Sequence, residues 1–139
     1  MKIDTERITS LIGEIEKATN ILDEFAKEDK ENILNNQKSL GSIKYFLIIA
    51  TEACIDICNH IIAKEHIGVP ESYSDCFNIL CKKGIITKEL AAKLIKMAKF
   101  RNLLVHLYWK IDDEQIYEIL KFELSDFAEF IKQVAKKYL

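Results

Sequence analysis

Turn-forming residues are scarce in this chain, which contains one proline and four glycines among 139 residues. Sheet-rich folds need frequent tight turns, and those turns draw heavily on glycine and proline. Hydrophobic residues make up 49% of the chain and charged residues 30%, as in a globular protein rather than a disordered one. The sequence therefore predicts one all-helical domain over residues 1–139, long enough to bury a core.

Apolar residues recur at three- and four-residue steps through most of the chain, which is the spacing of amphipathic helices. We predict long helices over about residues 4–25 and 37–64, joined by the charged stretch KEDKEN (27–32). The second of these is apolar on most faces and should lie at the centre of a bundle. A short helix should start at Ser72 and stop at Gly84.

Two more helix starts carry capping signals. Thr87 can cap a fourth helix, and Asp112 and Gln115 occupy the N-cap and N3 positions of a fifth. Ile111 and Ile116 flank that start as a hydrophobic staple, and we expect the fifth helix to continue to the C-terminus. Short connections between four long helices predict an antiparallel four-helix bundle with one additional short helix.

The N-terminus and the cysteines indicate the cellular compartment. MKIDTERITS carries charges where a secretory signal would be apolar, and the uncharged run over residues 45–51 is far shorter than the roughly 20 residues of a membrane span. We therefore expect a cytoplasmic protein. Its four cysteines should be reduced core residues, and their C-x3-C and C-x4-C spacings fit no strong zinc pattern, so no metal or cofactor is expected. These are Cys54, Cys58, Cys76 and Cys81.

Positive charge is concentrated in one part of a chain whose net charge is −2. Residues 82–110 contain eight basic residues and one acid, so this segment carries +7 and the remainder −9. Part of the charge would be the solvated face of a helix. A local positive field would nevertheless suit an anionic partner, although the overall balance argues against a generic nucleic-acid binder.

The stretch RNLLVHLYW (101–109) embeds polar groups in an apolar segment of the predicted fourth helix. Arg101 falls in line with the core positions of that helix, where a snorkelling side chain or a structural ion pair would explain it. However, the chain has eighteen lysines and only two arginines. Guanidinium offers phosphate a rigid two-pronged donor that an ammonium cannot imitate, which favours a functional Arg101.

His106 is the second polar residue of this stretch, and its pKa range suits proton transfer near neutrality. On a continuous helix it would lie about 140° from Arg101, whereas Tyr108 would line up with Arg101. Arg101 and His106 would therefore meet only if the helix ends nearby or if a second subunit completes the site.

Arg101, Asn102, His106 and Tyr108 together form R-N-x3-H-x-Y, which resembles the R-x4-H-x-Y motif of HepT-like toxins in the HEPN superfamily. The upstream segments EACIDICNHII (52–62) and PESYSDCFNILCKKGII (70–86) resemble that family too. HepT-like proteins are all-α bundles encoded beside a minimal nucleotidyltransferase antitoxin. The resemblance implies a metal-independent endoribonuclease that acts as a homodimer with the two motifs facing each other.

The resemblance also implies a role for each motif residue. His106 would accept the 2′-hydroxyl proton of RNA or protonate the leaving 5′-oxygen, while Arg101 would neutralise charge on the phosphate. Asn102 would orient the phosphate or the histidine. Tyr108 is the motif tyrosine to which the antitoxin attaches adenylate. The implied partners are RNA and a cognate nucleotidyltransferase, with no membrane or DNA partner expected.

Several alternatives remain open at this point. The chain could be a non-catalytic HEPN module that binds nucleotide or presents substrate to a separate nucleotidyltransferase, or a helical scaffold in which Arg101 and His106 are structural. Glu52, Asp56 and His60 recur at four-residue steps and share a helix face. They could pair with Arg101 or form ordinary salt bridges of the bundle, and we assign them no catalytic role.

Overall fold

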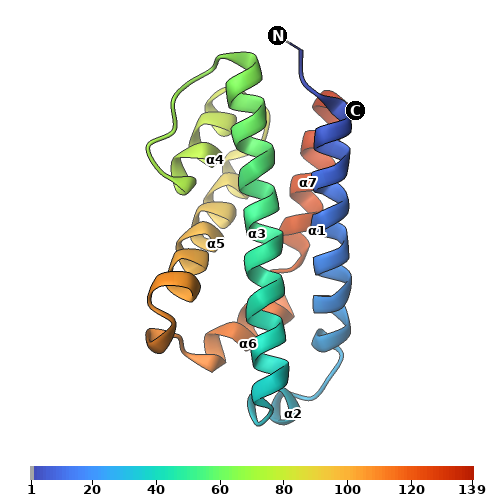
Figure 1. The fold of residues 1–139 in the computed structure, drawn as a ribbon, viewed down its shortest axis with the longest axis vertical. Coiled ribbons are helices and arrows are strands. Elements are labelled where there is room, and N and C mark those ends of the chain that lie inside the picture. The colour runs from blue at the N-terminus through green and yellow to red at the C-terminus, as the bar shows by residue number, and fades with distance from the viewer. Residues whose placement is uncertain (1) are drawn as a thin grey trace.

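Helices and the connections between them make up the part of the chain described by the structure, a computed structural model covering residues 2–139 (Figure 1). This confirms the predicted all-α fold. No strand occurs among these residues. In chain order, the helices are α1 (Thr5–Ala26), α2 (Lys30–Leu34), α3 (Gln37–Glu65), α4 (Tyr73–Lys82), α5 (Lys88–His106), the short 3-10 helix η1 (Tyr108–Lys110), α6 (Asp113–Phe122) and α7 (Ser125–Tyr138).

Helix α3 lies at the centre, as its apolar sequence predicted. It packs along α1 on one side and against α4 and α5 on the other, while α6 crosses one end of the bundle and α7 runs back along its length (Figure 1). By length and composition α3 is apolar enough to cross a membrane, but 56% of that apolar stretch is buried inside the bundle. Its hydrophobicity is therefore explained by its place in the core.

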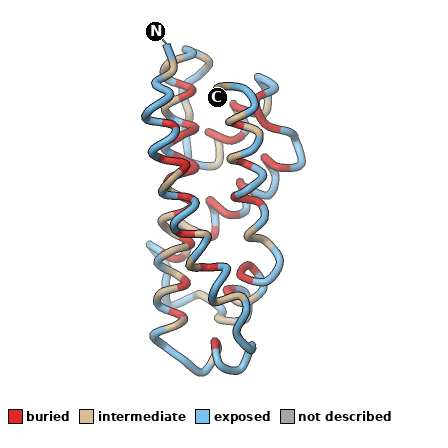
Figure 2. Tube along the Cα trace, turned by 90° about the vertical axis from the view of Figure 1, so that its right-hand side faces the viewer, coloured by how far each residue is buried: buried red, intermediate tan, exposed pale blue. Residues whose placement is uncertain are grey.

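The core runs the length of the bundle, with buried positions turned inward on every long helix (Figure 2). Phe77 of α4 and Phe130 of α7 are fully buried and meet edge to face, with ring centroids 6.1 Å apart. All four cysteines are free; Cys54, Cys58 and Cys76 are buried, as predicted for core residues, whereas Cys81 is only half-buried. Burial raises the pKa of Cys76 to about 11, so this thiol stays protonated near neutrality.

The predicted helix starts at Ser72, Thr87 and Asp112 are confirmed by side-chain caps. Ser72 Oγ accepts a hydrogen bond from the Asp75 amide at 3.1 Å, and Thr87 Oγ1 accepts one from Leu90 at 3.2 Å. Asp112 Oδ1 accepts one from the Glu114 amide at 3.0 Å. Each bond satisfies one amide that the first helical turn would otherwise leave without a partner.

The structure differs from the sequence prediction in two segments. The stretch expected to be only a connection contains the short helix α2, and the expected fifth helix is broken at Glu123 and Leu124 into α6 and α7. The apolar positions Ile116, Leu120 and Phe127 stay in helical phase across the break, so periodicity does not reveal it. Packing decides it: α6 contacts α1, α2 and α3, whereas α7 contacts α1, α3 and α5.

Candidate functional site

Arg101 is held between two helices by hydrogen bonds to both ends of its guanidinium. Its Nη2 donates to Glu52 Oε1 of α3 at 2.5 Å, and its Nη1 donates to Asn102 Oδ1 at 3.1 Å. The Arg101 side chain is 12% exposed, compared with 40% for Glu52. This ion pair at the α3–α5 contact resolves one open alternative, because Glu52 is the acidic residue that faces Arg101.

Tyr73 and the Arg101 Nε complete the surroundings of this guanidinium. The Tyr73 ring, at the start of α4, has its centroid 5.1 Å from Arg101 Cζ, close enough for a cation–π contact. Arg101 Nε is buried and forms no hydrogen bond with any residue that the structure describes.

His106 is exposed and is the last residue of α5, which ends where the Leu107 amide bonds back to the Leu103 carbonyl at 2.9 Å. Helix α5 is therefore not continuous through the motif: Tyr108 begins η1 and does not extend the line of Arg101 on α5. The chain must turn between His106 and the capped start of α6 at Asp112. Within the described chain, no hydrogen bond joins Arg101 to His106.

The segment after His106 presents aromatic rings to solvent. Tyr108 and Trp109 are 67% and 65% exposed and pack edge to face on each other, with centroids 5.3 Å apart. Val105, one residue before His106, is also exposed, as is Tyr73. Exposed apolar side chains of this size, two of them packed on each other, are typical of a surface that another protein covers.

The other two polar residues of the α3 face, Asp56 and His60, do not contact Arg101. His60 Nε2 accepts a hydrogen bond from the Asp4 amide at 3.0 Å and so fastens the chain ahead of α1. Burial lowers the pKa of His60, with a further lowering by Lys64. Burial raises the pKa of the Asp56 carboxyl, opposed by the nearby Arg7. These two residues therefore belong to the α1–α3 contact.

The site contains the groups needed for phosphate chemistry. In the part of the chain that the structure describes, no group of three His, Cys, Asp or Glu side chains lies close enough to hold a metal ion. Arg101 supplies a fixed cation with nitrogen donors, and His106 supplies an imidazole open to solvent. Sequence reasoning did not assign a role to Glu52 or notice Tyr73, whose only sequence signal was its place in the segment PESYSDCFNILCKKGII.

Comparison with protein families identifies the chain. The model of the ribonuclease HepT-like family matches residues 15–134, which includes Glu52, Tyr73 and the whole 101–109 stretch. The chain belongs to the ribonuclease HepT-like family. The resemblance noted from the sequence motif is thereby confirmed at the level of the family, while the roles of the individual residues remain predictions.

Two HepT-like relatives with assigned activities resemble the chain in sequence. It is 39% identical over 80 residues to the mRNA nuclease HepT of Shewanella oneidensis, a match that covers 58% of this chain and 60% of the relative. It is 28% identical over 130 residues to the tRNA nuclease HepT of Aphanizomenon flos-aquae, which covers 93% of this chain and 83% of that protein. The named activities belong to those relatives.

A solved HepT-like structure resembles the chain in fold. This is the tri-AMPylated HEPN toxin of Shewanella oneidensis in complex with an MNT antitoxin, which superposes with a TM-score of 0.88 at 28% identity. The superposition covers 94% of this chain and 97% of the toxin. The two chains therefore share the same helical arrangement over nearly their whole lengths.

Proposed function

We propose that the protein is a metal-independent endoribonuclease, the toxin of a toxin–antitoxin pair, with Arg101 and His106 as its catalytic residues. The observation that carries the proposal is the fixed guanidinium of Arg101, held by Glu52 and Asn102 one and a half turns before an exposed histidine. The nuclease activities of two relatives of this family support the same reaction.

RNA supplies its own nucleophile, the 2′-hydroxyl next to the scissile phosphate. An imidazole at His106 accepts that proton, and the oxygen attacks phosphorus while the bond to the 5′-oxygen breaks. Arg101 neutralises the charge that grows on the non-bridging oxygens, where preorganised donors stabilise the transition state most. Asn102, already bonded to Arg101, orients the guanidinium or the phosphate. The products carry 2′,3′-cyclic phosphate and 5′-hydroxyl ends.

A homodimer would complete the site. The reaction needs one group to take a proton and another to give one, and a single chain offers one histidine near Arg101. Two copies with residues 101–109 facing each other would supply both, and the exposed side chains of Val105, Tyr108 and Trp109 would pack at the same contact. This arrangement accounts for polar residues placed within an apolar segment.

Tyr108 is the proposed site of regulation. Its ring is 67% exposed and lies two residues after His106, within reach of a modifying enzyme. An adenylate there would place negative charge and bulk in the cleft that receives RNA phosphate. The AMPylated toxin bound to an MNT antitoxin supports this regulation, with a cognate minimal nucleotidyltransferase as the partner of this chain.

Cleavage of end-labelled RNA in EDTA by the wild-type protein and by His106→Ala tests the proposal. We expect the wild-type protein to leave 2′,3′-cyclic phosphate ends and His106→Ala to be inactive but folded. Products with 3′-hydroxyl ends would instead indicate an activated water and a metal. Tight RNA binding without cleavage by the wild-type protein would favour the non-catalytic HEPN module.

A further inference from the structure

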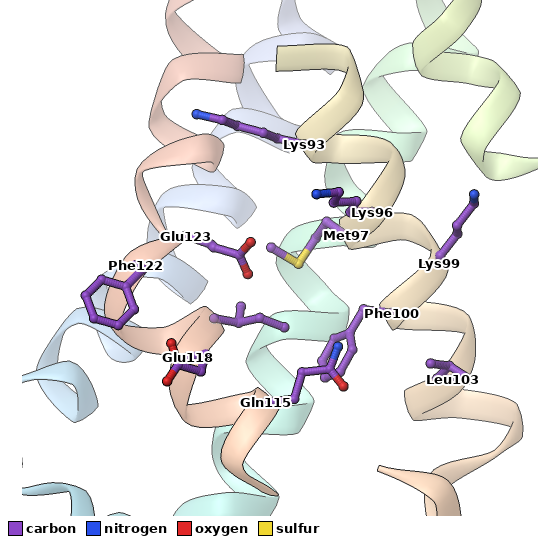
Figure 3. Close-up of a pocket in the computed structure, with 11 residues that line it drawn as sticks. Lys93, Lys96, Met97, Lys99, Phe100, Leu103, Gln115, Glu118, Phe122 and Glu123 are labelled. Carbon is purple, nitrogen blue, oxygen red and sulfur yellow. The ribbon is translucent and has the colours of Figure 1, made fainter. Parts of the chain in front are cut away.

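A cavity of about 480 Å³ opens between α5 and α6 (Figure 3), and neither Glu52 nor Tyr73 lines it. We call it the α5–α6 pocket. Its floor is apolar, formed by Met97, Phe100 and Ile119. This volume lies in the range of pockets that hold small ligands or single nucleotides. Neither the proposed catalysis nor the proposed modification of Tyr108 uses this pocket.

The two walls of the pocket differ in chemistry. Helix α5 contributes Lys93, Lys96 and Lys99 (Figure 3). Lys93 is 3.8 Å from the buried Asp126, whereas Lys96 and Lys99 form no ion pair among the described residues. The α5 wall therefore offers the Lys96 ammonium to an anion in the pocket, whereas the Lys99 side chain extends away from α6 along the outer side of α5 (Figure 3).

Helix α6 forms a wall that suits the edge and face of a base. Gln115 and Glu118 of α6 and Glu123, just after its end, line it, and Phe122 stands at its outer border with 73% of its surface exposed (Figure 3). Amide and carboxylate groups form hydrogen bonds with the exocyclic amino groups of bases. An exposed aromatic ring can stack on the face of a base. Burial raises the pKa of the Glu123 carboxyl, with a further rise caused by Asp126.

One edge of the pocket lies on the same side of α5 as His106. Lys99, Leu103 and His106 follow one another at four- and three-residue steps, so they share one side of the helix, and Lys99 and Leu103 line the pocket. Seven residues of helix span about 10 Å. A strand whose phosphate lies at His106 therefore reaches the pocket within a few nucleotides.

We infer that the α5–α6 pocket binds an unpaired nucleotide of the RNA strand flanking the cleaved bond, with its phosphate at Lys96 and its base against Phe122, while Lys99 contacts the next phosphate on the way to His106. This inference rests on the proposed ribonuclease function and adds a substrate site to it. It also explains why positive charge is concentrated on α5 in a chain whose net charge is −2. The pocket selects single-stranded over paired RNA, since a base in a duplex cannot enter it.

Binding of a fluorescent single-stranded RNA, measured by anisotropy in the uncleaving His106→Ala background, tests this site. The variants are the pair Lys96→Gln with Lys99→Gln, and Phe122→Ala alone. The charge-retaining pair Lys96→Arg with Lys99→Arg and the remote pair Lys17→Gln with Lys27→Gln are the controls.

The affinity of the double variant Lys96→Gln with Lys99→Gln should depend less steeply on salt than that of the parent protein. We expect the slope of log affinity against log salt concentration to decrease in magnitude by about 0.7 for each lost phosphate contact. Phe122→Ala should weaken binding about tenfold, the usual loss for one stacked base. Both controls should bind like the parent protein. AMP added as a competitor distinguishes a strand from a free mononucleotide: displacement of the RNA at micromolar AMP would overturn the assignment to a strand.

Cleavage assays on proteins that retain His106 separate this inference from the proposed function. If the wild-type chain cleaves RNA while the glutamine pair and Phe122→Ala bind and cleave like the controls, the pocket assignment alone is wrong. If the wild-type chain does not cleave but these variants lose RNA affinity, the nuclease proposal fails and the pocket stands. Loss of nucleotidyltransferase binding with unchanged RNA affinity would make the pocket a protein-docking site and overturn the inference.

Discussion

Glu52 Oε1 accepts a hydrogen bond from Arg101 Nη2 at 2.5 Å, which ties the central helix α3 to the end of α5. With Asn102 on Nη1 and the Tyr73 ring 5.1 Å from Cζ, the guanidinium has partners on three sides. Such contacts fix the plane of the donor before substrate arrives. We therefore propose that Glu52 acts through Arg101 as a positioning residue, a role distinct from catalysis.

Glu52→Gln should lower kcat for RNA cleavage about 10- to 100-fold, because a small displacement of a catalytic donor has effects of this size. KM should change little, since the amide neither blocks the cleft nor adds charge that repels RNA. Steady-state kinetics on a labelled RNA measure both constants. Partial recovery in Glu52→Asp would show that the carboxylate, and not the size of the side chain, is needed.

The matched control is Asp56→Asn, one turn later on the same helix, where the side chain is exposed and does not contact Arg101. It removes the same charge from α3 and should cleave at the wild-type rate. Equal rates for Glu52→Gln and Asp56→Asn would show that the ion pair does not position Arg101.

Arg101→Lys should lose at least 99% of the activity although it keeps the charge, because one ammonium cannot form the parallel contacts of a guanidinium. Removing one donor that stabilises the transition state lowers kcat by about 100- to 1000-fold in other enzymes. Arg7→Lys, at the only other arginine, is the matched control and should be fully active. An Arg101→Lys variant that cleaves at a rate within twofold of wild type would remove this residue from the mechanism.

The proposed dimer can be tested at Val105, which is 38% exposed between Arg101 and Tyr108. Val105→Glu would bury a charge in the contact, so the variant should be monomeric by light scattering and should lose activity. Val69→Glu, at an 86% exposed position outside the motif, should leave both properties unchanged. A wild-type chain that is monomeric at micromolar concentration while it cleaves RNA would contradict the shared site.

The overall fold could be predicted from the sequence because local physics determines most of it. The capping residues Ser72, Thr87 and Asp112 act within their own first turns, and apolar periodicity records which helix faces are buried. Arg101 could also be singled out from the sequence as a candidate functional residue, because it is a single arginine among lysines at a core-type position of its helix.

Features that depend on packing between distant segments could not be predicted. The break between α6 and α7 leaves the apolar phase intact, so only the contacts with other helices reveal it. Three polar residues shared one face of α3, and only the placement of α5 shows that Glu52 meets Arg101 while His60 meets the Asp4 amide. Tyr73 lies 28 positions before Arg101 in the chain, and no local pattern connects them.

The contact between His60 and Asp4 predicts a pH dependence of stability. Burial lowers the pKa of His60 below its ordinary value of 6.5, so the folded state binds fewer protons than the unfolded state in this range. This contribution is therefore fully present above about pH 6.5 and declines as the pH falls through the lowered pKa. Protonation also removes the lone pair on Nε2 that accepts the Asp4 amide hydrogen.

His60→Gln keeps an acceptor for the Asp4 amide but cannot titrate. Melting temperatures of both proteins between pH 8 and pH 5 should therefore diverge, with the wild-type protein losing more than the variant on acidification. Parallel curves would mean that His60 does not contribute to acid sensitivity.

Tyr108 provides the final prediction. Co-expression with a cognate minimal nucleotidyltransferase, with ATP present, should add one or more AMP units to its hydroxyl oxygen, which displaces pyrophosphate from ATP. The added phosphodiester would compete with RNA for Arg101, so the modified protein should not cleave RNA. Tyr108→Phe should remain a folded nuclease that this enzyme cannot silence, whereas Tyr45→Phe, at an exposed tyrosine of α3, should be modified and silenced like wild type. Intact-mass spectrometry with peptide mapping measures the modification, and adenylate on another residue, or covalent silencing of Tyr108→Phe, would show that regulation acts elsewhere.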